Sequence, residues 1–263
     1  MVQLSNRGTD TPSGNSFVLW QAEDLSNALT NQTADLRFDW RNELPVLVIN
    51  EAHKLSESSA RSLQGLPVVL VELSGNDNAS PHADIVVDSE EELTALLEYI
   101  SQNPVASVIC CQVLRHSEDL STNLGLLLES VSYGTLQNGN EFKKWLDARG
   151  RRVRPDETSP TVLINAESEH VELQLNRPKL KNAFSASMRD SLVEALRGLA
   201  ADGDDRSILI TGKGSTFCIG GDPAEFGTVE NSATGHMIRS IANAAPWLDL
   251  LSERITVRVH GAA

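Results

Sequence analysis

The first half of the chain alternates between short apolar runs and segments with helical periodicity. Apolar runs rich in β-branched residues lie at residues 45–50, 67–73 and 83–87, and each has the length of a strand. Ser89 is followed three residues later by Glu92, which is the spacing of a capping box and predicts the start of a helix. The apolar positions of that helix recur at helical spacing at Leu93, Leu96, Leu97 and Ile100.

The rest of this half continues the alternation. The run VASVICCQVL at residues 105–114 predicts a buried strand, and helices are expected near residues 120–131 and 141–149. Cys110 and Cys111 lie inside the apolar run, so we expect them to pack in a core rather than to serve a redox or metal role. Strands that alternate with helices indicate a small α/β layer structure.

The second half shows the same alternation. Residues 171–175 (VELQL) alternate like a half-buried strand, residues 207–211 and 255–261 predict two more strands, and residues 185–201 predict a helix. The order strand–helix–strand–helix–strand is typical of parallel βα units. A second helix of about twenty residues is expected to carry the apolar positions Met237, Ile238, Ile241, Ala245 and Leu248.

A charged segment with two prolines, residues 147–161, has the composition of a linker. We therefore place a domain boundary near residue 157, between an α/β extension at residues 1–157 and a second part at residues 158–263. Residues 1–16 are polar and lack the apolar core of a signal peptide, so they are expected to form a loose tail.

The acidic composition narrows the classes of partner. The 263 residues carry a net charge of −14; residues 161–263 contribute −3, from 10 Lys/Arg and 13 Asp/Glu, which leaves −11 for residues 1–160. Such a surface argues against general binding to nucleic acids or anionic membranes. No apolar run reaches about 18 residues, the length that indicates a membrane span. The 3 cysteines form no disulfide framework, which predicts a reducing, cytoplasmic location, and no metal site is expected.

Glycine-rich nucleotide-binding motifs are incomplete in the second half. TGKGST contains Gly-Lys, but Lys213 is followed by Gly214, and Ser207 stands where a Walker A loop requires its first glycine. No G-x-G-x-x-G follows a strand. The glycines of STFCIGGDPAEF, residues 215–226, therefore form either a tight turn before a helix or a loop whose backbone N–H groups face a ligand.

Three longer motifs occur in order between Val171 and Ala263: VELQLNRPKLKNAFSASM, SILITGKGSTFCIGGDPAEF and ITVRVHGAA. Together they resemble the first half of the core of the crotonase, or enoyl-CoA hydratase/isomerase, superfamily. The resemblance implies a partial crotonase-like ββα spiral core preceded by the α/β extension. A weaker resemblance, in LESVSYGTLQNGNEFKKWL at residues 128–146, relates the extension to that of some long crotonase-like proteins.

The resemblance also implies a site. Members of the family hold the carbonyl oxygen of an acyl-CoA thioester with two backbone N–H groups, and one of these corresponds to Gly221. Preorganised amides stabilise the charge of a developing enolate, and a small residue allows close approach. Coenzyme A is part of the substrate, so no separate cofactor is implied. The expected substrate-binding residues are Lys179, Leu180, Lys181, Ala183, Cys218, Gly220, Asp222 and Pro223.

Several of these residues have a structural explanation as well. Lys179 and Lys181 either meet coenzyme A phosphates or are solvated surface residues. Asp222 and Glu225 are also explained as capping residues at a helix start. His260 is expected to be a structural residue at a strand end rather than a general base.

The resemblance implies enolate stabilisation on an acyl-CoA, with hydration of a 2-enoyl-CoA as the default reaction and isomerisation, thioester hydrolysis or oxygenation as related ones. The sequence ends at VHGAA, before the segment that supplies the second amide and the catalytic glutamates in the family. We therefore expect an incomplete enzyme, one fragment of a split enzyme completed by a C-terminal chain, or a non-catalytic module that binds CoA esters or a protein. A homo-oligomer is also expected.

Overall fold

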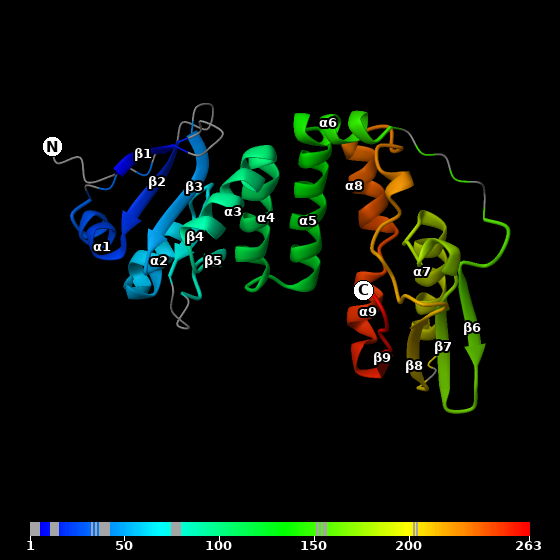
Figure 1. Ribbon diagram of the computed structural model, residues 1–263. Coiled ribbons are helices and arrows are strands. Elements are labelled where there is room, and N and C mark those ends of the chain that lie inside the picture. Colours follow the sequence, from blue (N-terminus) through cyan, green and yellow to red (C-terminus); the bar gives the residue numbers. More distant parts are fainter. Residues whose placement is uncertain are drawn as a thin grey trace. The chain divides into compact units, whose positions relative to one another are not determined.

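The computed structural model describes residues 6–10, 16–32, 34, 36, 43–74, 80–150, 152, 154, 157–201, 203 and 205–263. Its contacts divide the chain into two compact units, Met1–Leu120 and Ser121–Ala263, and each unit contains its own sheet (Figure 1). Both sheets combine parallel and antiparallel pairs and carry helices. The predicted α/β class is therefore confirmed.

The first unit is a five-stranded sheet with helices on both faces. Its strands follow the order β1-β2-β3-β4-β5, with β1 antiparallel to β2 and the other pairs parallel. The elements are β1 (Asn6–Asp10), β2 (Ser16–Gln21), α1 (Ala22–Thr30), β3 (Glu43–Asn50), η1 (Ala52–Lys54), α2 (Glu57–Gln64), β4 (Val69–Leu73), β5 (Ile85–Val87), α3 (Glu90–Gln102) and α4 (Pro104–Ser117).

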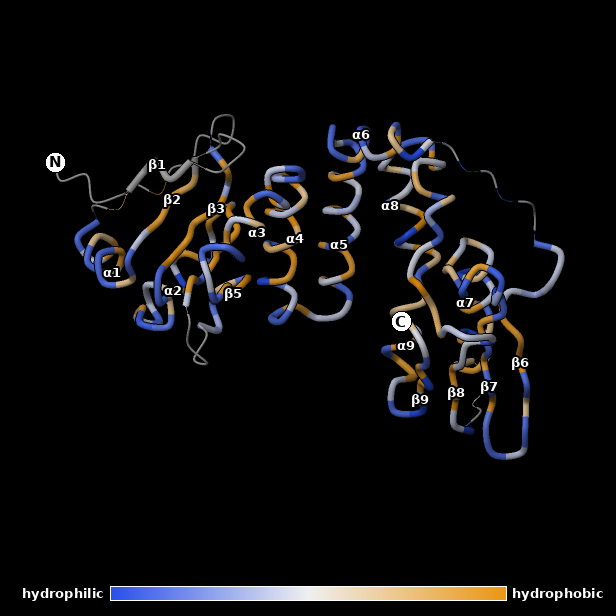
Figure 2. The backbone as a smooth tube through the Cα atoms, in the orientation of Figure 1, coloured by the Kyte–Doolittle hydropathy of each residue, from blue (hydrophilic) through white to orange (hydrophobic). Residues whose placement is uncertain are grey.

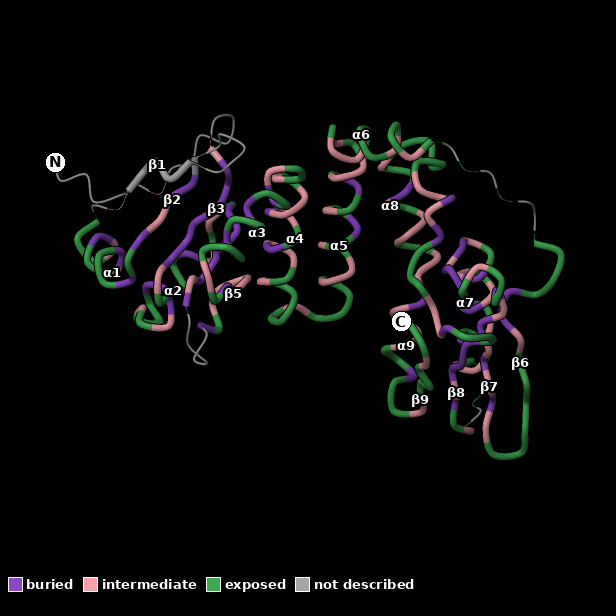
Figure 3. Tube along the Cα trace, in the orientation of Figure 1, coloured by how far each residue is buried: buried purple, intermediate pink, exposed green. Residues whose placement is uncertain are grey.

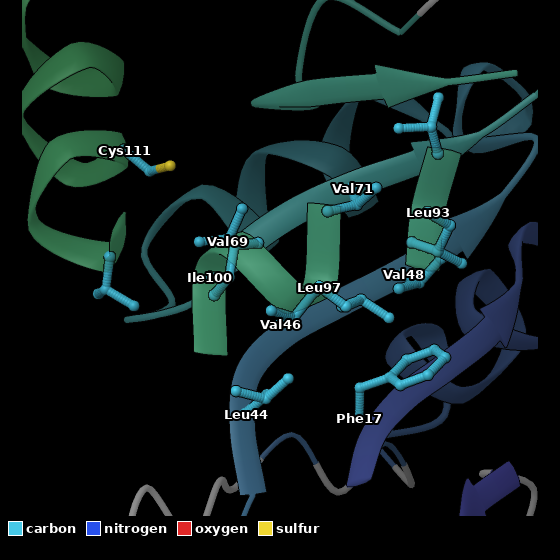
Figure 4. Close-up of a cluster of buried hydrophobic side chains, with 12 residues drawn as sticks. Phe17, Leu44, Val46, Val48, Val69, Val71, Leu93, Leu97, Ile100 and Cys111 are labelled. Carbon is cyan, nitrogen blue, oxygen red and sulfur yellow. The ribbon is translucent and has the colours of Figure 1, made fainter. Parts of the chain in front are cut away.

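Two apolar cores cover the two faces of this sheet. Six consecutive residues of β3 are buried, as expected for a parallel strand that is covered on both sides, and Figure 2 shows β3 as a hydrophobic stretch. On one face, α3 and α4 pack over Val46, Val48 and Val69 (Figure 4). On the other face, α1 and α2 pack over Leu47 and Leu70. The strands expected at residues 45–50, 67–73 and 83–87 thus become β3, β4 and β5.

The prediction of a strand at residues 105–114 is wrong, because this run lies within the helix α4. Pro104 occupies the first turn, where its missing N–H costs nothing, and it starts the helix. Only one side of the run is buried: Val108 and Cys111 enter the core, whereas Cys110 and Leu114 are exposed. The spacing of three between the buried residues is helical. Burial raises the pKa of the Cys111 thiol to about 12, as expected of a core cysteine.

The loose tail expected at residues 1–16 is also wrong in part. Asn6–Asp10 forms β1, which pairs with β2, so the backbone of this polar segment obtains its hydrogen bonds from a neighbouring strand. The rest of that call, residues 1–5 and 11–15, lies outside the described residues. Sequence patterning also missed β2 and α1, because SFVLWQ runs into the helix without a turn residue between them.

A buried glutamate connects three segments of the first unit. Glu72 of β4 is fully buried, and one of its carboxylate oxygens accepts hydrogen bonds from the backbone N–H of His53 (3.0 Å), while His53 Nδ1 lies 2.8 Å away. The other oxygen accepts the backbone N–H of Ser80 at 2.6 Å. A buried carboxylate requires such partners, so His53 is part of the fold here rather than a solvated surface residue.

The second unit is a four-stranded sheet with helices before its first strand and between its later strands. Its order is β6-β7-β8-β9, with β6 antiparallel to β7 and the other pairs parallel. The elements are α5 (Thr122–Gln137), α6 (Asn140–Arg149), β6 (Val162–Ala166), β7 (His170–Leu175), η2 (Pro178–Leu180), α7 (Ala186–Ala201), β8 (Ser207–Gly212), η3 (Pro223–Glu225), α8 (Ser232–Ile241), α9 (Ala245–Leu250), η4 (Ser252–Arg254) and β9 (Ile255–Val257).

The core of this unit lies between β7, β8 and α7. Leu173, Met188, Leu196 and Ile208 are fully buried there, at the alternating strand positions and the helical positions that the sequence predicted. The edge strand β6 was not predicted, and burial explains this: its first residue is buried and its last three are exposed, so the strand carries no regular alternation (Figure 3).

The prediction of a single helix of about twenty residues is wrong, because the chain forms two helices, α8 and α9, in its place. Pro246 stands in the first turn of α9 and cannot donate a hydrogen bond to the preceding helix. The side chain of Asn243 accepts a hydrogen bond from the backbone N–H of Ala245 at 3.0 Å, just before the start of α9. The last strand is also shorter than expected, since β9 ends at Val257.

Packing divides the chain at residues 120 and 121, whereas the sequence placed its boundary near residue 157. The difference comes from α5 and α6, which pack with the second unit. Arg239 of α8 donates hydrogen bonds to the side chain and the carbonyl of Ser130 on α5, at 2.9 and 3.0 Å. Such contacts between residues far apart in sequence leave no mark on the composition of either segment.

Candidate functional site

The loop around Gly221 is held by a single β-bridge. Phe184, which precedes α7, pairs with Gly221 in parallel orientation: Phe184 N–H donates to the Gly220 carbonyl (2.8 Å), and Asp222 N–H donates to the Phe184 carbonyl (2.9 Å). In this pattern the flanking residues 220 and 222 make the hydrogen bonds, so the N–H of Gly221 itself points away from Phe184. Within the described residues Gly221 N–H has no hydrogen-bond partner, and Gly221 is exposed.

Gly220 and Gly221 differ in backbone conformation and in the space around them. Gly220 has φ of 83°, in the region that disfavours residues with a side chain, and it turns the backbone into the bridge. Gly221 does not have a positive φ; a Cβ there would lie 3.4 Å from Cε1 of Phe226, an ordinary contact distance. The sequence pair Gly-Gly is therefore one turn residue followed by one exposed amide donor.

Arg177 clamps both sides of this bridge. Its guanidinium is buried and donates to the carbonyl of Ala183, just before Phe184, and to the carboxylate of Asp222 (3.0 Å), just after Gly221. Its Nε donates to Glu157, at the entry to the unit's sheet. Charge-assisted hydrogen bonds of this kind are strong and directional. The position of the Gly221 amide is thus fixed by an arginine that lies 45 residues from Asp222 in the sequence.

Asp222 is buried, and its carboxylate is fully engaged by protein groups. One oxygen accepts the backbone N–H of Ala224 (3.0 Å) and Arg154 (3.2 Å), and the other accepts Arg177. Burial acts to raise the pKa of Asp222, but the Ala224 N–H and the guanidinium groups of Arg154 and Arg177 outweigh it and hold the pKa below its usual value of 3.8. Asp222 therefore positions the loop through hydrogen bonds to both of its carboxylate oxygens.

This shift makes a contribution to stability that depends on pH. Because the pKa of Asp222 is lowered by folding, the ionised carboxylate stabilises the native state above pH 3.8, and the contribution is lost as the pH falls through the lower folded value. Asp222→Asn should therefore be less stable than the natural protein at pH 6, and the difference should shrink below pH 3.8. Urea unfolding of both proteins at pH 6 and pH 3 measures this; a difference that stays constant across this range would contradict it.

The loop before α7 is fixed by Asn182. This residue is fully buried with φ of 53°, its Oδ1 accepts the N–H of Arg177 (2.8 Å), and its Nδ2 donates to the carbonyls of Lys213 and Thr216 (both 2.9 Å). The side chain thus joins this loop to the one that follows β8. Asparagine tolerates the left-handed region better than most residues, and here it satisfies three backbone groups at once.

The other expected binding residues occupy different positions around the bridge. Lys179 and Lys181 are exposed, Leu180 is half-buried and Ala183 is buried. The Ala183 carbonyl accepts from Arg177. Along the other loop, Cys218 and Pro223 are half-buried and Gly220 is exposed. The structure thus brings the two predicted loops together at the bridge, with the lysines at the surface.

The remaining candidate acids and bases are engaged in structural contacts. Both oxygens of Glu225 accept the N–H of Ala186 (3.0 and 2.9 Å), at the start of α7. His260 Nε2 lies 3.0 Å from the Gly214 carbonyl, and the His260 carbonyl accepts Phe217 N–H. His236 Nδ1 lies 2.9 Å from Ser130 Oγ. The contacts of Glu225 and His260 agree with the structural roles expected from the sequence, and His236 likewise makes a contact within the fold.

Residues of α6 also reach the site, and sequence reasoning missed them. Arg149 donates a hydrogen bond to the carbonyl of Pro223, and its guanidinium carbon lies 5.0 Å from the ring centre of Trp145. Its Nη2 is buried without a hydrogen-bond partner in the described part of the chain. No local pattern in α6 points to a site; only the density of Trp, Phe and Arg in one short helix could have drawn attention to it.

Among the described residues, no helix is long and apolar enough to cross a membrane. No group of three or more His, Cys, Asp or Glu side chains among those same residues is arranged to hold a metal ion.

Comparison with known proteins places these residues in context. A family model described as enoyl-CoA hydratase/isomerase matches residues 166–254. The chain is 29% identical over 105 residues to the enoyl-CoA hydratase/isomerase homologue YngF of Bacillus subtilis, covering 39% of this chain and 40% of that protein. It is 38% identical over 61 residues to 1,2-epoxyphenylacetyl-CoA isomerase of Escherichia coli, covering 23% of each.

Among solved structures, an enoyl-CoA hydratase of Mycobacterium smegmatis is 28% identical with a TM-score of 0.35, and the match covers 39% of this chain and 41% of that one. The chain thus spans between 23% and 41% of the length of each of these relatives.

Proposed function

Since residues 166–254 belong to the enoyl-CoA hydratase/isomerase family, we propose that this unit binds acyl-CoA thioesters and stabilises an enolate formed from them. The observation that carries the proposal is the N–H of Gly221, which is exposed, without a partner in the described residues, and fixed by the Phe184 bridge. Such an amide is a donor for a thioester oxygen that gains negative charge. Hydration of a 2-enoyl-CoA is the default reaction.

An oxyanion hole uses two donors, and hydration also requires an acid and a base near the reacting carbon. The carboxylates nearest to Gly221 in sequence, Asp222 and Glu225, are engaged by Arg177, Arg154, Ala224 and Ala186. We therefore propose that the second donor and the acid–base groups come from a complementing C-terminal chain or from another copy in a homo-oligomer. The proposed setting is the cytoplasm.

Lys179 and Lys181 are the proposed contacts of the coenzyme A phosphates. Both are exposed and lie in the loop that Asn182 joins to the segment after β8. In a chain of net charge −14, such lysines supply local positive charge for an anionic ligand.

A binding module without catalysis is the second candidate, because the two carboxylates of the loop, Asp222 and Glu225, are bound to protein groups. Calorimetric titration with butyryl-CoA and an assay for loss of the conjugated thioester of crotonyl-CoA separate the two. Binding of the thioester together with hydration supports the enzyme candidate. Binding without hydration, even after the C-terminal half of a family member is added, supports the non-catalytic binding module. If neither thioester binds, both candidates are wrong.

A further inference from the structure

Three aromatic side chains form a cluster beside the Gly221 loop. Phe142 and Trp145 of α6 have ring centres 5.8 Å apart, and Trp145 and Phe226 have ring centres 5.9 Å apart. We call these three residues the aromatic wall. Phe142 and Phe226 are half-buried, and Trp145 is 41% exposed, so the wall presents ring surface to solvent. Exposed rings gathered in one place often mark a binding surface.

One ring of the aromatic wall, that of Phe226, lies next to Gly221, the proposed donor. Ring atoms of Phe226 lie 3.4 and 3.5 Å from the position that a Cβ of Gly221 would occupy. A carbonyl oxygen that accepts a hydrogen bond from Gly221 N–H would lie about 2.9 Å from that nitrogen. An acyl group bound at the Gly221 N–H would thus lie near Phe226, the ring of the wall that is next to Gly221, and a larger acyl group could extend to Trp145.

Close packing holds the wall against the loop. A Cβ at Gly227 would lie 2.6 Å from Cδ2 of Leu146, so α6 approaches the loop as closely as a glycine permits. Arg149 stacks on Trp145 and donates to the carbonyl of Pro223, which ties the helix to the loop by a second contact. Trp145 is thus fixed relative to Gly221, as a specific binding surface requires.

We propose that the aromatic wall binds the acyl group of the substrate and that it favours planar aryl-acyl thioesters, such as phenylacetyl-CoA, over short alkyl ones. The inference rests on the proposed function. An aromatic acyl group would pack on Phe226 and Trp145 in the offset or edge-to-face arrangements that ring pairs adopt. Trp145 is then a specificity-determining residue, supplied by a helix that precedes the family segment at residues 166–254.

Titration of the full chain with phenylacetyl-CoA, butyryl-CoA and free coenzyme A tests the proposal. We expect phenylacetyl-CoA to bind about tenfold more tightly than butyryl-CoA. Trp145→Ala should weaken phenylacetyl-CoA binding about tenfold and leave butyryl-CoA binding within about twofold. Trp247→Phe is the matched control, because Trp247 lies on α9 beside Arg197 and should leave both affinities unchanged. Circular dichroism confirms that each variant is folded.

Titration with free coenzyme A tests the alternative that the aromatic wall binds the nucleotide end of the ligand. Aromatic rings also stack on adenine, and the exposed Lys143 and Lys144 on the same helix could contact its phosphates. If Trp145→Ala weakens free coenzyme A and both thioesters equally, the wall binds the nucleotide end and the proposal is overturned. Equal affinities for the two thioesters in the natural protein would also overturn it. That outcome differs from failure of the proposed function, in which neither thioester binds at all.

Discussion

Replacing Gly221 by proline is expected to lower thioester turnover by about 10²–10³-fold, the usual effect of removing one oxyanion donor. Proline has no N–H, so the proposed donor disappears. The bridge itself is retained, because its hydrogen bonds belong to Phe184 N–H and Asp222 N–H. Turnover of crotonyl-CoA, in the assembly that supports it, measures the effect. The ¹³C shift of the bound carbonyl of butyryl-CoA reports the same loss without turnover.

Gly221→Ala is the matched control. Alanine keeps the N–H, and its Cβ would meet Phe226 at 3.4 Å, where a small movement of the ring accommodates it. We expect the alanine variant to retain the carbonyl shift and most of the turnover. If the proline variant also turns over at a near-normal rate, the oxyanion donor lies elsewhere.

Arg177→Ala should have the largest effect on stability. The change leaves Asp222 buried with one of its two guanidinium partners removed, and it also removes the donor to the Ala183 carbonyl. Breaking a buried ion pair on one side typically costs about 3–5 kcal/mol. Urea unfolding at pH 7, with a probe in the second unit such as the fluorescence of Trp247, measures the loss.

Arg189→Ala provides the comparison, since Arg189 pairs with Asp190 at the surface, where Asp190 is largely exposed. An exposed pair of this kind contributes about 0–1 kcal/mol. If the two arginine variants lose equal stability, the buried network around Asp222 is not what holds the loop. Arg177→Lys separates charge from geometry, because lysine keeps the charge but cannot reach Ala183, Asp222 and Glu157 together.

Local pattern predicted those parts of the fold in which each residue's burial follows the period of its own element. Leu173 and Ile208 alternate in β7 and β8, and Met188 and Leu196 repeat along α7, so strand and helix were recognised directly. The pattern failed where burial was one-sided in an apolar run, as in α4, or where an edge strand was largely exposed, as in β6. In both cases tertiary packing, rather than propensity, decides which positions are buried.

The candidate site divides in the same way. The two loops could be predicted because their motifs resemble those of a known family, whereas the glycine run CIGGD alone left a plain turn open. The contacts that fix them could not: Arg154 reaches Asp222 across 68 residues and Arg149 reaches Pro223 across 74. Nothing in the sequence near either arginine shows which carbonyl or carboxylate it will meet. The motif thus predicts Gly221 as the donor, and the structure identifies the residues that hold Gly221 in place.

The pairing of α5 with α8 also has a consequence during synthesis. Ser130 and Arg239 are separated by 109 residues, so α5 leaves the ribosome well before its partner has been made. At about 5–20 residues per second, the delay is roughly 5–20 seconds. Throughout that time the face of α5 that later packs on α8 is uncovered, next to a stripe of apolar side chains at Leu124, Leu127 and Val131 that the second unit itself does not bury. This helix is therefore where we expect a chaperone to bind the nascent chain.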